Sequence, residues 1–334
     1  MQVITNKKKA ALYTSRILDN YLSGKSFAVF DIETLGLDPN RAPVILCGLN
    51  EIDKDGTCTI TQYFAEEIED EKELLTMLYE KLNTLDYVIT YNGRHFDIPY
   101  ITKRCEKNSL DLRLKPYNLD LYLMIQKCSE LRSILPNLKQ KTVEEYMGLK
   151  SGRLDEISGK ESIELYYHYL LEEDAESKEA LKQVILLHNH DDVLQLYGLM
   201  PVLRNVDIHK AFYSFGLPCE DGKVIDKIKL SSKKLEISGH YYGSPLSYIS
   251  FKAENCPFDI EISNDWTFSC SMPIECLNGS KFINLNEIFD EKSIEMFSSY
   301  PGYINNYLIL SNGPDINYLD INMLSKEIVN SVNV

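Results

Sequence analysis

The sequence predicts an α/β domain, in which helices flank a mixed sheet, followed by a smaller β-rich domain of the α+β kind. Strands and helices alternate through the first 200 residues, and helical patterns dominate from Ser129 to Pro201. Beyond Gly222, short strands with alternating apolar residues take over. Three successive strands before the first crossover helix indicate an antiparallel meander, which the later strand–helix crossovers extend into a mixed sheet.

The first domain is predicted to span residues 25–204, after an amphipathic N-terminal helix over residues 1–24 that does not resemble a signal peptide. Apolar runs of strand length and helical periodicity define its elements. We expect strands at Phe27–Thr34, Pro43–Glu51, Thr57–Phe64 and Tyr87–Asn92, and helices at Glu71–Asn83, Ile98–Glu106 and Glu176–Leu199.

Residues 205–222 are predicted to be a linker, because proline and glycine cluster there and periodicity fades. The accessory domain then spans residues 223–334. Its expected strands lie in LSYISF, FDIEISND, WTFSCSMPI and YINNYLIL, and its last helix lies near Asn322–Val332.

Composition narrows the class of protein. The chain has 334 residues, of which 44% are hydrophobic and 25% charged, as in folded globular proteins with room for two cores. No apolar run approaches the length that crosses a bilayer, so we expect a cytoplasmic protein with no membrane partner. The eight cysteines form no C-x-x-C pair, which indicates neither a zinc site nor a disulfide framework.

The formal net charge of −15 argues against extensive coating of duplex nucleic acid, which depends on clustered lysine and arginine. Four local basic patches remain, and each is either a solvated surface or part of a local phosphate track. They are NKKK (residues 6–9), TKRC (102–105), LRLK (112–115) and KVIDKIKLSSKK (223–234).

Two carboxylates interrupt the first predicted strand, FAVFDIETLGLD. Asp31 and Glu33 are two residues apart, so their side chains point to the same face, about 6–7 Å from each other. Two buried anions at that separation repel, so that one takes up a proton or a cation lies between them.

Two later stretches supply possible partners. In VITYNGRHFDIPYI, Asp97 follows a strand and precedes a helix, where it is either a functional carboxylate or an ordinary helix N-cap. In LLHNHDDVLQLYGL, His188 and Asp192 are four residues apart and share an apolar helix face. That pair is also compatible with a structural histidine or a surface ion pair.

The order of these motifs points to metal chemistry. Four carboxylates and one imidazole, placed at the end of a first strand, after a later strand and in a closing helix, suit two hard divalent cations, Mg²⁺ or Mn²⁺. Two such ions about 4 Å apart hold a phosphodiester, activate water and stabilise the leaving oxygen.

The motifs FDIETLGL, YNGRHFDIPYI and HNHDDVLQL resemble those of the DEDD 3′–5′ exonucleases on the RNase H-like fold, over about residues 27–199. The middle motif is similar to that of family B DNA polymerase proofreading domains. The resemblance is closest to the YprB-type predicted exonucleases, through the connecting segment Asn137–Leu170.

The resemblance implies metal ligands at Asp31, Glu33, Asp97 and Asp192, with His188 as the general base. Helix phase alone does not choose between Asp191 and Asp192, and the family pattern H-N-x-x-D-V favours Asp192.

The residues after the first motif, Thr34, Leu35 and Gly36, are candidates for holding the terminal nucleotide. Asn92 either contacts the penultimate sugar or phosphate or only closes its turn.

Three functions compete at this stage. The first is a metal-dependent exonuclease that acts on the 3′ end of single-stranded DNA or RNA. It is favoured because all four carboxylates are present in this sequence. The alternatives are a catalytically silent nucleic-acid-binding module and a structure-selective endonuclease. No obligate protein partner is indicated. In the accessory domain, Tyr241, Tyr242, Tyr248 and Phe251 are either core residues or a base-stacking platform near the lysines of residues 223–234.

Overall fold

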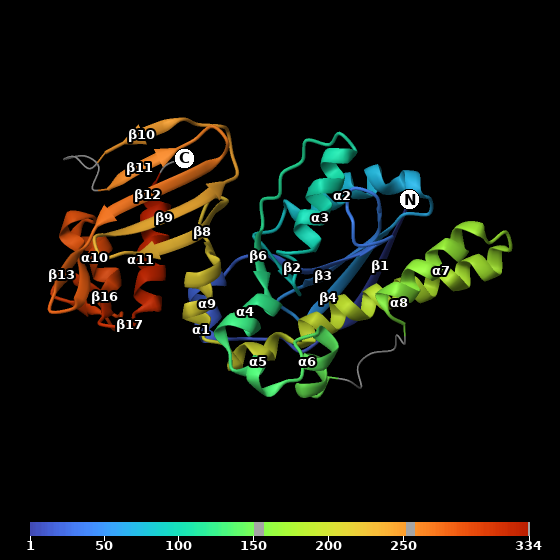
Figure 1. Ribbon diagram of the computed structural model, residues 1–334, viewed down its shortest axis with the longest axis horizontal. Helices are drawn as coiled ribbons and strands as arrows, with labels where there is room; N and C mark the ends of the chain where they lie inside the picture. Colours follow the sequence, from blue (N-terminus) through green and yellow to red (C-terminus); the bar gives the residue numbers. More distant parts are fainter. Residues whose placement is uncertain (150–156, 252–257, 333–334) are drawn as a thin grey trace. The chain divides into compact units, whose positions relative to one another are not determined.

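A computed structural model describes residues 1–149, 157–251 and 258–332 of the chain. It divides into two compact units, Met1–Val206 and Asp207–Val334 (Figure 1). Residues 150–156, within the predicted connecting segment, lie outside the described residues.

The first unit is built on one six-stranded sheet, ordered β1-β4-β3-β2-β5-β6. The strands β4, β3 and β2 form an antiparallel meander, and β5 and β6 run parallel to β2. The predicted mixed sheet is thereby confirmed. Its strands are β1 (Gln2–Lys9), β2 (Phe27–Thr34), β3 (Val44–Ile52), β4 (Thr57–Phe64), β5 (Tyr87–Thr90) and β6 (Tyr117–Asp120).

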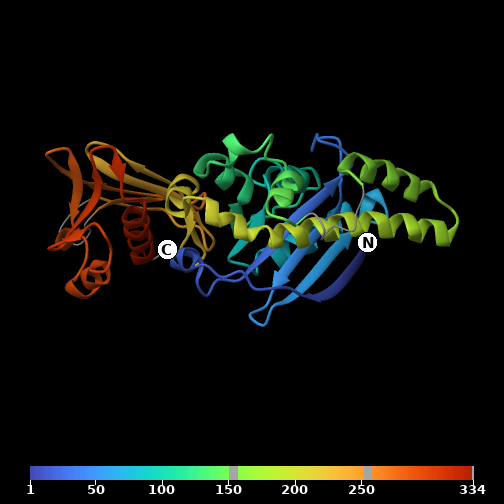
Figure 2. The same ribbon diagram turned by 90° about the horizontal axis from the view of Figure 1, so that it is seen from below.

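Helices cover both faces of this sheet. One face packs residues such as Phe30 and Ile32 of β2 against α2 (Glu71–Leu82) and α3 (Asp97–Lys107). The opposite face packs Ile45 and Phe64 against α7 (Gly159–Leu171) and α8 (Ala175–Gly198). Because side chains alternate along a strand, Asp31 and Glu33 point to the α8 side. Figure 2 shows α8 crossing the strands of the sheet.

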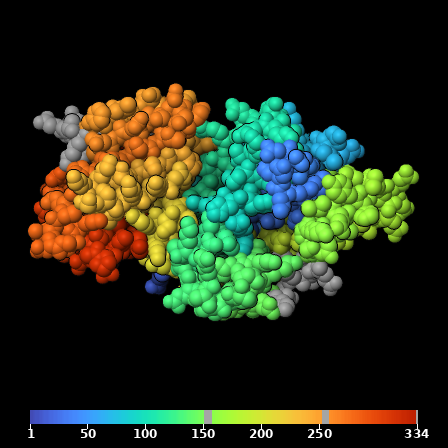
Figure 3. Space-filling model, in the orientation of Figure 1, coloured from blue at the N-terminus to red at the C-terminus, as the bar shows by residue number. Residues whose placement is uncertain are grey.

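Shorter helices complete the unit, and the hairpin of α7 and α8 projects from its edge (Figure 3). The shorter helices are α1 (Arg16–Leu22), η1 (Ile68–Asp70), α4 (Leu121–Cys128), α5 (Leu131–Ile134), α6 (Gln140–Tyr146) and η3 (Met200–Asn205).

The prediction of one helix over residues 1–24 is wrong. Residues Gln2–Lys9 form the edge strand β1, which pairs antiparallel with β4, and helix begins only at Arg16 behind the N-cap Ser15. The β-branched run Val3-Ile4-Thr5 favours a strand, and pairing satisfies the backbone groups of β4 that would otherwise be an open edge.

The second unit is β-rich with three α-helices among its described residues, as predicted for the accessory domain. Two sheets are ordered β10-β11-β12-β9-β8-β7 and β13-β14-β16-β15, the latter extended by β17 on β16.

The strands are β7 (Leu217–Pro218), β8 (Lys223–Leu230), β9 (Lys234–Tyr241), β10 (Tyr248–Ser250), β11 (Asp259–Ile262), β12 (Thr267–Pro273), β13 (Glu275–Leu277), β14 (Ser280–Asn284), β15 (Tyr303–Ile304), β16 (Tyr307–Asn312) and β17 (Asp315–Ile316). The helices are α9 (Ile208–Phe215), η4 (Leu285–Glu287), α10 (Glu291–Phe297) and α11 (Tyr318–Ser331).

The segment 205–222 is not an irregular linker. Ile208, Phe212 and Phe215 recur at helical spacing and are buried in α9, and β7 pairs with β8 in the larger sheet. The chain divides into its two units between Val206 and Asp207, so the predicted linker is mostly part of the second unit.

The four aromatic residues considered for a base-stacking platform do not all lie on the surface. Tyr241 is buried, whereas Tyr242, Tyr248 and Phe251 are exposed. In the sheet, β11, β12 and β9 separate β10, which carries Tyr248, from the lysine-bearing strand β8. In the part of the chain that the structure describes, no helix is both long and apolar enough to cross a membrane.

Candidate metal centre

The strand β2 supplies the first two carboxylates on the sheet face that α8 covers. Glu33 is buried and Asp31 is half-buried. The register between β2 and β3 shifts after Glu33, at the end of the strand. Such an irregularity bends the strand and redirects the chain, and here it leads out of the sheet directly after the two acids.

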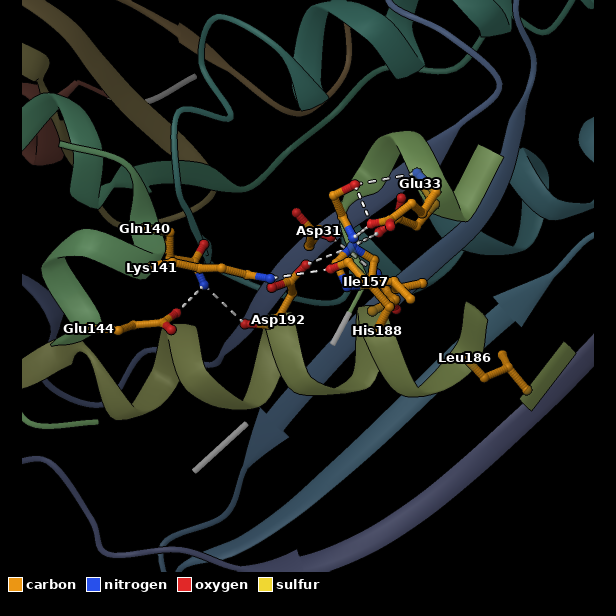
Figure 4. A network of polar contacts seen from close by, with 12 residues as sticks. Asp31, Glu33, Gln140, Lys141, Glu144, Ile157, Leu186, His188 and Asp192 are labelled. Atoms are coloured by element: carbon orange, nitrogen blue, oxygen red, sulfur yellow. Dashed lines mark hydrogen bonds and ion pairs between the residues drawn. The ribbon is translucent and has the colours of Figure 1, made fainter. Parts of the chain in front are cut away.

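The helix α8 brings His188 and Asp192 to these carboxylates (Figure 4). The Nε2 atom of His188 lies 3.5 Å from Oε1 of Glu33 and 3.6 Å from Oδ2 of Asp192. Ligand atoms of these three residues all lie within 4.8 Å of one another. They come from a strand and a helix, and Glu33 precedes His188 by 155 residues in the sequence.

The structure also distinguishes the two neighbouring aspartates of α8. Asp192 faces His188 and keeps part of its side chain open to solvent. Asp191 is buried, with its Oδ1 3.2 Å from Nδ1 of His190. Of the two, Asp192 is therefore the one that shares the cluster with Glu33 and His188.

Asp97 is the first residue of α3, and the N-cap is Phe96, so Asp97 is not the cap of its helix. Burial raises the pKa of its carboxyl to about 7, against hydrogen bonding from its own backbone and that of Ile32. The charge of Asp120 raises this pKa further. A carboxyl group with a pKa near 7 is stabilised by binding a proton or by a neighbouring cation.

Electrostatics tie Asp31 to the other three carboxylates. Burial raises the pKa of Asp31 well above its usual value, and the charges of Asp97, Asp192 and Glu33 raise it further. Only the hydrogen bond from Asn189 acts in the opposite direction. The charges of the other three predicted ligands therefore act on Asp31, and this repulsion favours a compensating positive charge.

The residues present fit hard divalent cations. Carboxylate oxygens are the ligands that Mg²⁺ and Mn²⁺ prefer, and four of them converge from β2, α3 and α8. His188 is a borderline ligand for these ions, and its place between Glu33 and Asp192 also suits a proton acceptor.

The helix α6 contacts the part of α8 that carries Asp192, and the sequence did not predict this contact. Nε2 of Gln140 donates to Oε1 of Glu144 at 2.9 Å and to the backbone oxygen of Asp192 at 3.4 Å. Nζ of Lys141 donates to the backbone oxygen of Ile157 at 3.3 Å (Figure 4). The predicted connecting segment therefore contacts the helix turn that carries Asp192.

The predicted substrate-binding residues occupy two loops. Thr34 Oγ1 donates to the backbone oxygen of Gly36, which also accepts from the Tyr100 hydroxyl, at 2.8 Å in both cases. Gly36 has φ of +152°, which favours glycine, and Leu35 N–H donates to Pro43. These contacts hold the turn after the first motif. Contact of these residues with a nucleotide stays a prediction.

Asn92 closes a turn, as one of its two interpretations requires. Its φ is +67°, and its backbone oxygen accepts from His95 and Phe96. Asp120, which the sequence reasoning missed, accepts hydrogen bonds from the backbone N–H groups of Asn92 and Arg94, each at 3.0 Å. The available signal was its position as the last residue of the short strand YNLD, directly before an apolar helix.

Comparison with known proteins matches the first unit. The family model described as the RNase_H superfamily (RNase_H_2) covers residues 28–204, more than half of the chain. This match confirms the predicted RNase H-like fold.

Among curated proteins, a DNA polymerase of Pyrococcus horikoshii is 35% identical over 99 residues, which are 27% of this chain and 8% of the polymerase. DNA polymerase 1 of Pyrococcus abyssi is 33% identical over 99 residues, covering 27% of this chain and 13% of that protein. The matched segment is thus a small part of these polymerases.

Among solved structures, the family B DNA polymerase from the hyperthermophilic archaeon Pyrobaculum calidifontis aligns with 54% of this chain and 24% of its own. The TM-score is 0.42 and the sequence identity 23%.

Proposed function

The chain belongs to the RNase H superfamily, and from this membership we propose that it is a metal-dependent 3′–5′ exonuclease of the DEDD type. The observation that carries the proposal is the cluster of Glu33, His188 and Asp192, together with the charges of Glu33, Asp97 and Asp192 that act on the Asp31 carboxyl. Similarity to DNA polymerases supports a nuclease, and the middle motif supports 3′–5′ polarity. The proposed substrate is single-stranded DNA or RNA.

In the proposed site, Asp31, Glu33, Asp97 and Asp192 hold two Mg²⁺ or Mn²⁺ ions. When bound, such ions orient a phosphodiester, lower the pKa of water and stabilise the leaving oxygen. Asp31, Glu33, Asp97 and Asp192 would hold the ions, with Glu33 and Asp192 on the side of His188.

His188 is the proposed general base. Its Nε2 lies beside Glu33 and Asp192, where it takes the proton of the attacking water. The two carboxylates orient the imidazole and stabilise the imidazolium that forms. Attack in line with the leaving 3′ oxygen then releases a nucleoside 5′-monophosphate. The turn at Thr34–Gly36 is the proposed seat of the terminal nucleotide.

The test is degradation of labelled single-stranded DNA and RNA oligonucleotides of matched sequence. We expect no cleavage in EDTA and stepwise shortening from the 3′ end in Mg²⁺ or Mn²⁺. Blocking the 3′ terminus should stop the reaction, and blocking the 5′ terminus should not. Asp31→Asn, which keeps the shape of the side chain but removes its charge, is the inactive control.

Each other result identifies a different function. Cleavage of a circular substrate would indicate the endonuclease alternative. Binding of oligonucleotides without cleavage in either metal would indicate a silent binding module. Equal cleavage with and without chelator would contradict the metal-dependent mechanism.

A further inference from the structure

Asn189 lies on the buried side of α8, between the two residues of the helix that belong to the metal centre. Its side chain is fully buried. Its Nδ2 atom donates to Oδ2 of Asp31 at 3.1 Å, and its Oδ1 atom accepts from Nε2 of Gln62 at 3.1 Å. It is therefore an uncharged donor in contact with the central carboxylate of the proposed site.

The direction of this hydrogen-bond chain is determined by the main chain. The backbone oxygen of Leu186, which can only accept, receives a hydrogen bond from Nε2 of Gln62 at 2.8 Å. The same amino group then donates to the carbonyl oxygen of Asn189. The remaining end of the Asn189 amide, its amino group, must point to Asp31. Without these contacts, a half-turn of the Asn189 amide would exchange the positions of its oxygen and its nitrogen. The hydrogen bonds hold the amide in one of these two orientations.

The sheet leaves space for this amide at a glycine. Gln62, Gly48 and Asp31 lie opposite one another on β4, β3 and β2, so they face α8 in one row. A Cβ atom at Gly48 would lie 2.2 Å from Oδ1 and 2.9 Å from Cγ of Asn189. Any larger residue at position 48 would displace the amide from the row.

We propose that Asn189 is a positioning residue, which orients the Asp31 carboxylate for the two metal ions through a built-in polar chain from Leu186 and Gln62. One hydrogen bond on Oδ2 restricts rotation of the carboxylate and leaves its other lone pairs for cations. Hydrogen bonds of this kind to metal ligands strongly affect metal affinity. The inference rests on the proposed metal-dependent function, which supplies the reason to orient Asp31.

The experiment measures Mn²⁺ affinity of the full chain by electron paramagnetic resonance of free Mn²⁺, together with thermal stability in EDTA. Asn189→Ala should weaken Mn²⁺ binding by about 10–100-fold. Gly48→Ala should weaken it in the same direction, although it adds only one methyl group, because that group displaces the amide. Wild-type Mn²⁺ affinity in Asn189→Ala would overturn the proposal.

The matched control is Asn50→Ala. Asn50 is equally buried, lies two residues after Gly48 on the same face of β3, and donates to the backbone oxygen of Val193 at 3.5 Å. The Asn50→Ala substitution removes a side-chain amide of the same kind beside α8, but this amide is not the one that donates to Asp31. Its Mn²⁺ affinity should match that of the wild type. An equal loss of affinity in Asn50→Ala and Asn189→Ala would show a general packing effect and overturn the positioning role.

The double variant Gly48→Ala/Asn189→Ala separates packing from positioning. Its added methyl group occupies the space that the missing amide leaves, so the fold should be more stable than in Asn189→Ala, while Mn²⁺ affinity should stay low. Recovery of affinity together with stability would overturn the proposal. Failure of the wild type itself to bind Mn²⁺ would contradict the proposed function, and the positioning role with it.

Discussion

At the scale of single residues, the least determined role is that of His188. Its Nε2 is nearly equidistant from Glu33 and Asp192, which suits a base that both acids orient. The same geometry suits a nitrogen ligand, because all three groups lie within 4.8 Å. Removal of the imidazole affects different quantities in the two cases: a base acts on the reaction rate, and a ligand acts on metal affinity.

We therefore predict that His188→Ala lowers kcat by about 10²–10⁴-fold and leaves Mn²⁺ affinity nearly unchanged, because the proposed ligands of the ions are carboxylate oxygens. Single-turnover cleavage and Mn²⁺ titration measure the two effects. His190→Ala is the control, since His190 faces Asp191 and not the cluster. A parallel loss of Mn²⁺ affinity and activity in His188→Ala would assign His188 as a ligand.

Individual residues also show what the sequence predicted about the site. Asp31 and Glu33 share a face because of strand alternation, and His188 and Asp192 share one because of helical spacing. These relations are local, and they are present in the structure. The choice between Asp191 and Asp192 was not local: both lie on partly apolar faces, and only the position of β2 separates them. The contact of Asn189 with Gln62 depends on three strands pairing in one register, which the sequence does not display.

At the scale of elements, α3 holds the loop that follows the first motif. The Tyr100 hydroxyl donates to the backbone oxygens of Gly36 and Ala42, and Arg104 donates to that of Pro39. These residues repeat at helical spacing, so one face of α3 holds the loop while its first turn carries Asp97. The helix thus links the position of Asp97 to that of the Thr34–Gly36 turn.

A buried ion pair fixes this face of α3 to α2. Nε of Arg104 donates to Oε1 of Glu71 at 2.6 Å, and Nη2 contacts Oε2. Glu71 also accepts from the backbone N–H of Val44 at 2.8 Å and from Nδ2 of Asn108 at 2.9 Å. With both charges paired and the carboxylate saturated, the geometry is that of a favourable buried pair.

Arg104→Met should destabilise the chain by about 3–5 kcal/mol, because it leaves the Glu71 charge buried without its partner. Urea unfolding followed by far-UV circular dichroism measures this loss. The matched control is Lys103→Met on the same helix, whose exposed pair with Glu106 should contribute less than about 1 kcal/mol. If the two variants lost equal stability, the buried pair would not be a principal constraint on α3.

In the second unit, the buried helix α11 carries an acid that makes stability depend on pH. Asp320 is buried and accepts a hydrogen bond from the Gly302 N–H at 3.1 Å, and burial raises its pKa from 3.8 to about 6. The unfolded chain releases this proton at lower pH than the folded chain does. Stability from Asp320 is therefore complete below pH 3.8 and declines as the pH rises toward about 6.

We predict that Asp320→Asn reduces this decline, since an amide at position 320 has no proton to lose in that range. The chain has one tryptophan, Trp266, and it lies in the same unit. Its fluorescence during urea unfolding at pH 4, 5 and 6 reports the stability of the unit directly. Identical pH dependence in the variant and the wild type would show that Asp320 is ionised in the folded state.

The sequence predicted best those elements that are long and that have turn residues at both ends. The strands β2 and β4 begin and end as expected, because turn residues bound long apolar or β-branched runs. The four-residue strand β6 was missed, since its pattern is too short to exhibit a period. The strand β1 was predicted to be part of a helix, although its β-branched run Val3-Ile4-Thr5 favours a strand, because its pairing with β4 is not visible in the sequence.

At the scale of the whole molecule, intramolecular acidic partners neutralise part of the basic charge in the predicted patches. Lys9 pairs with Asp55, Lys103 pairs with Glu106, and Arg104 is buried against Glu71. In the longest basic patch, Lys229 and Lys234 both contact Glu236. Together with the net charge of −15, these pairs reduce the positive charge that the predicted patches offer to phosphate groups.

Binding of a single strand should therefore depend on few phosphate contacts. For single-stranded nucleic acid, the logarithm of affinity falls with the logarithm of salt concentration by about 0.7 per phosphate neutralised. We predict a slope shallower than about −3, corresponding to about four contacts or fewer. The measurement is fluorescence anisotropy of a labelled oligonucleotide with Asp31→Asn, which binds without cleaving, over a range of KCl concentrations.

Replacing Lys7 and Lys8 of β1 by alanine should leave the slope unchanged, because we assign the substrate to the metal centre. A steep slope that those two substitutions reduce would show that a long basic surface, and not the metal centre, provides most of the affinity.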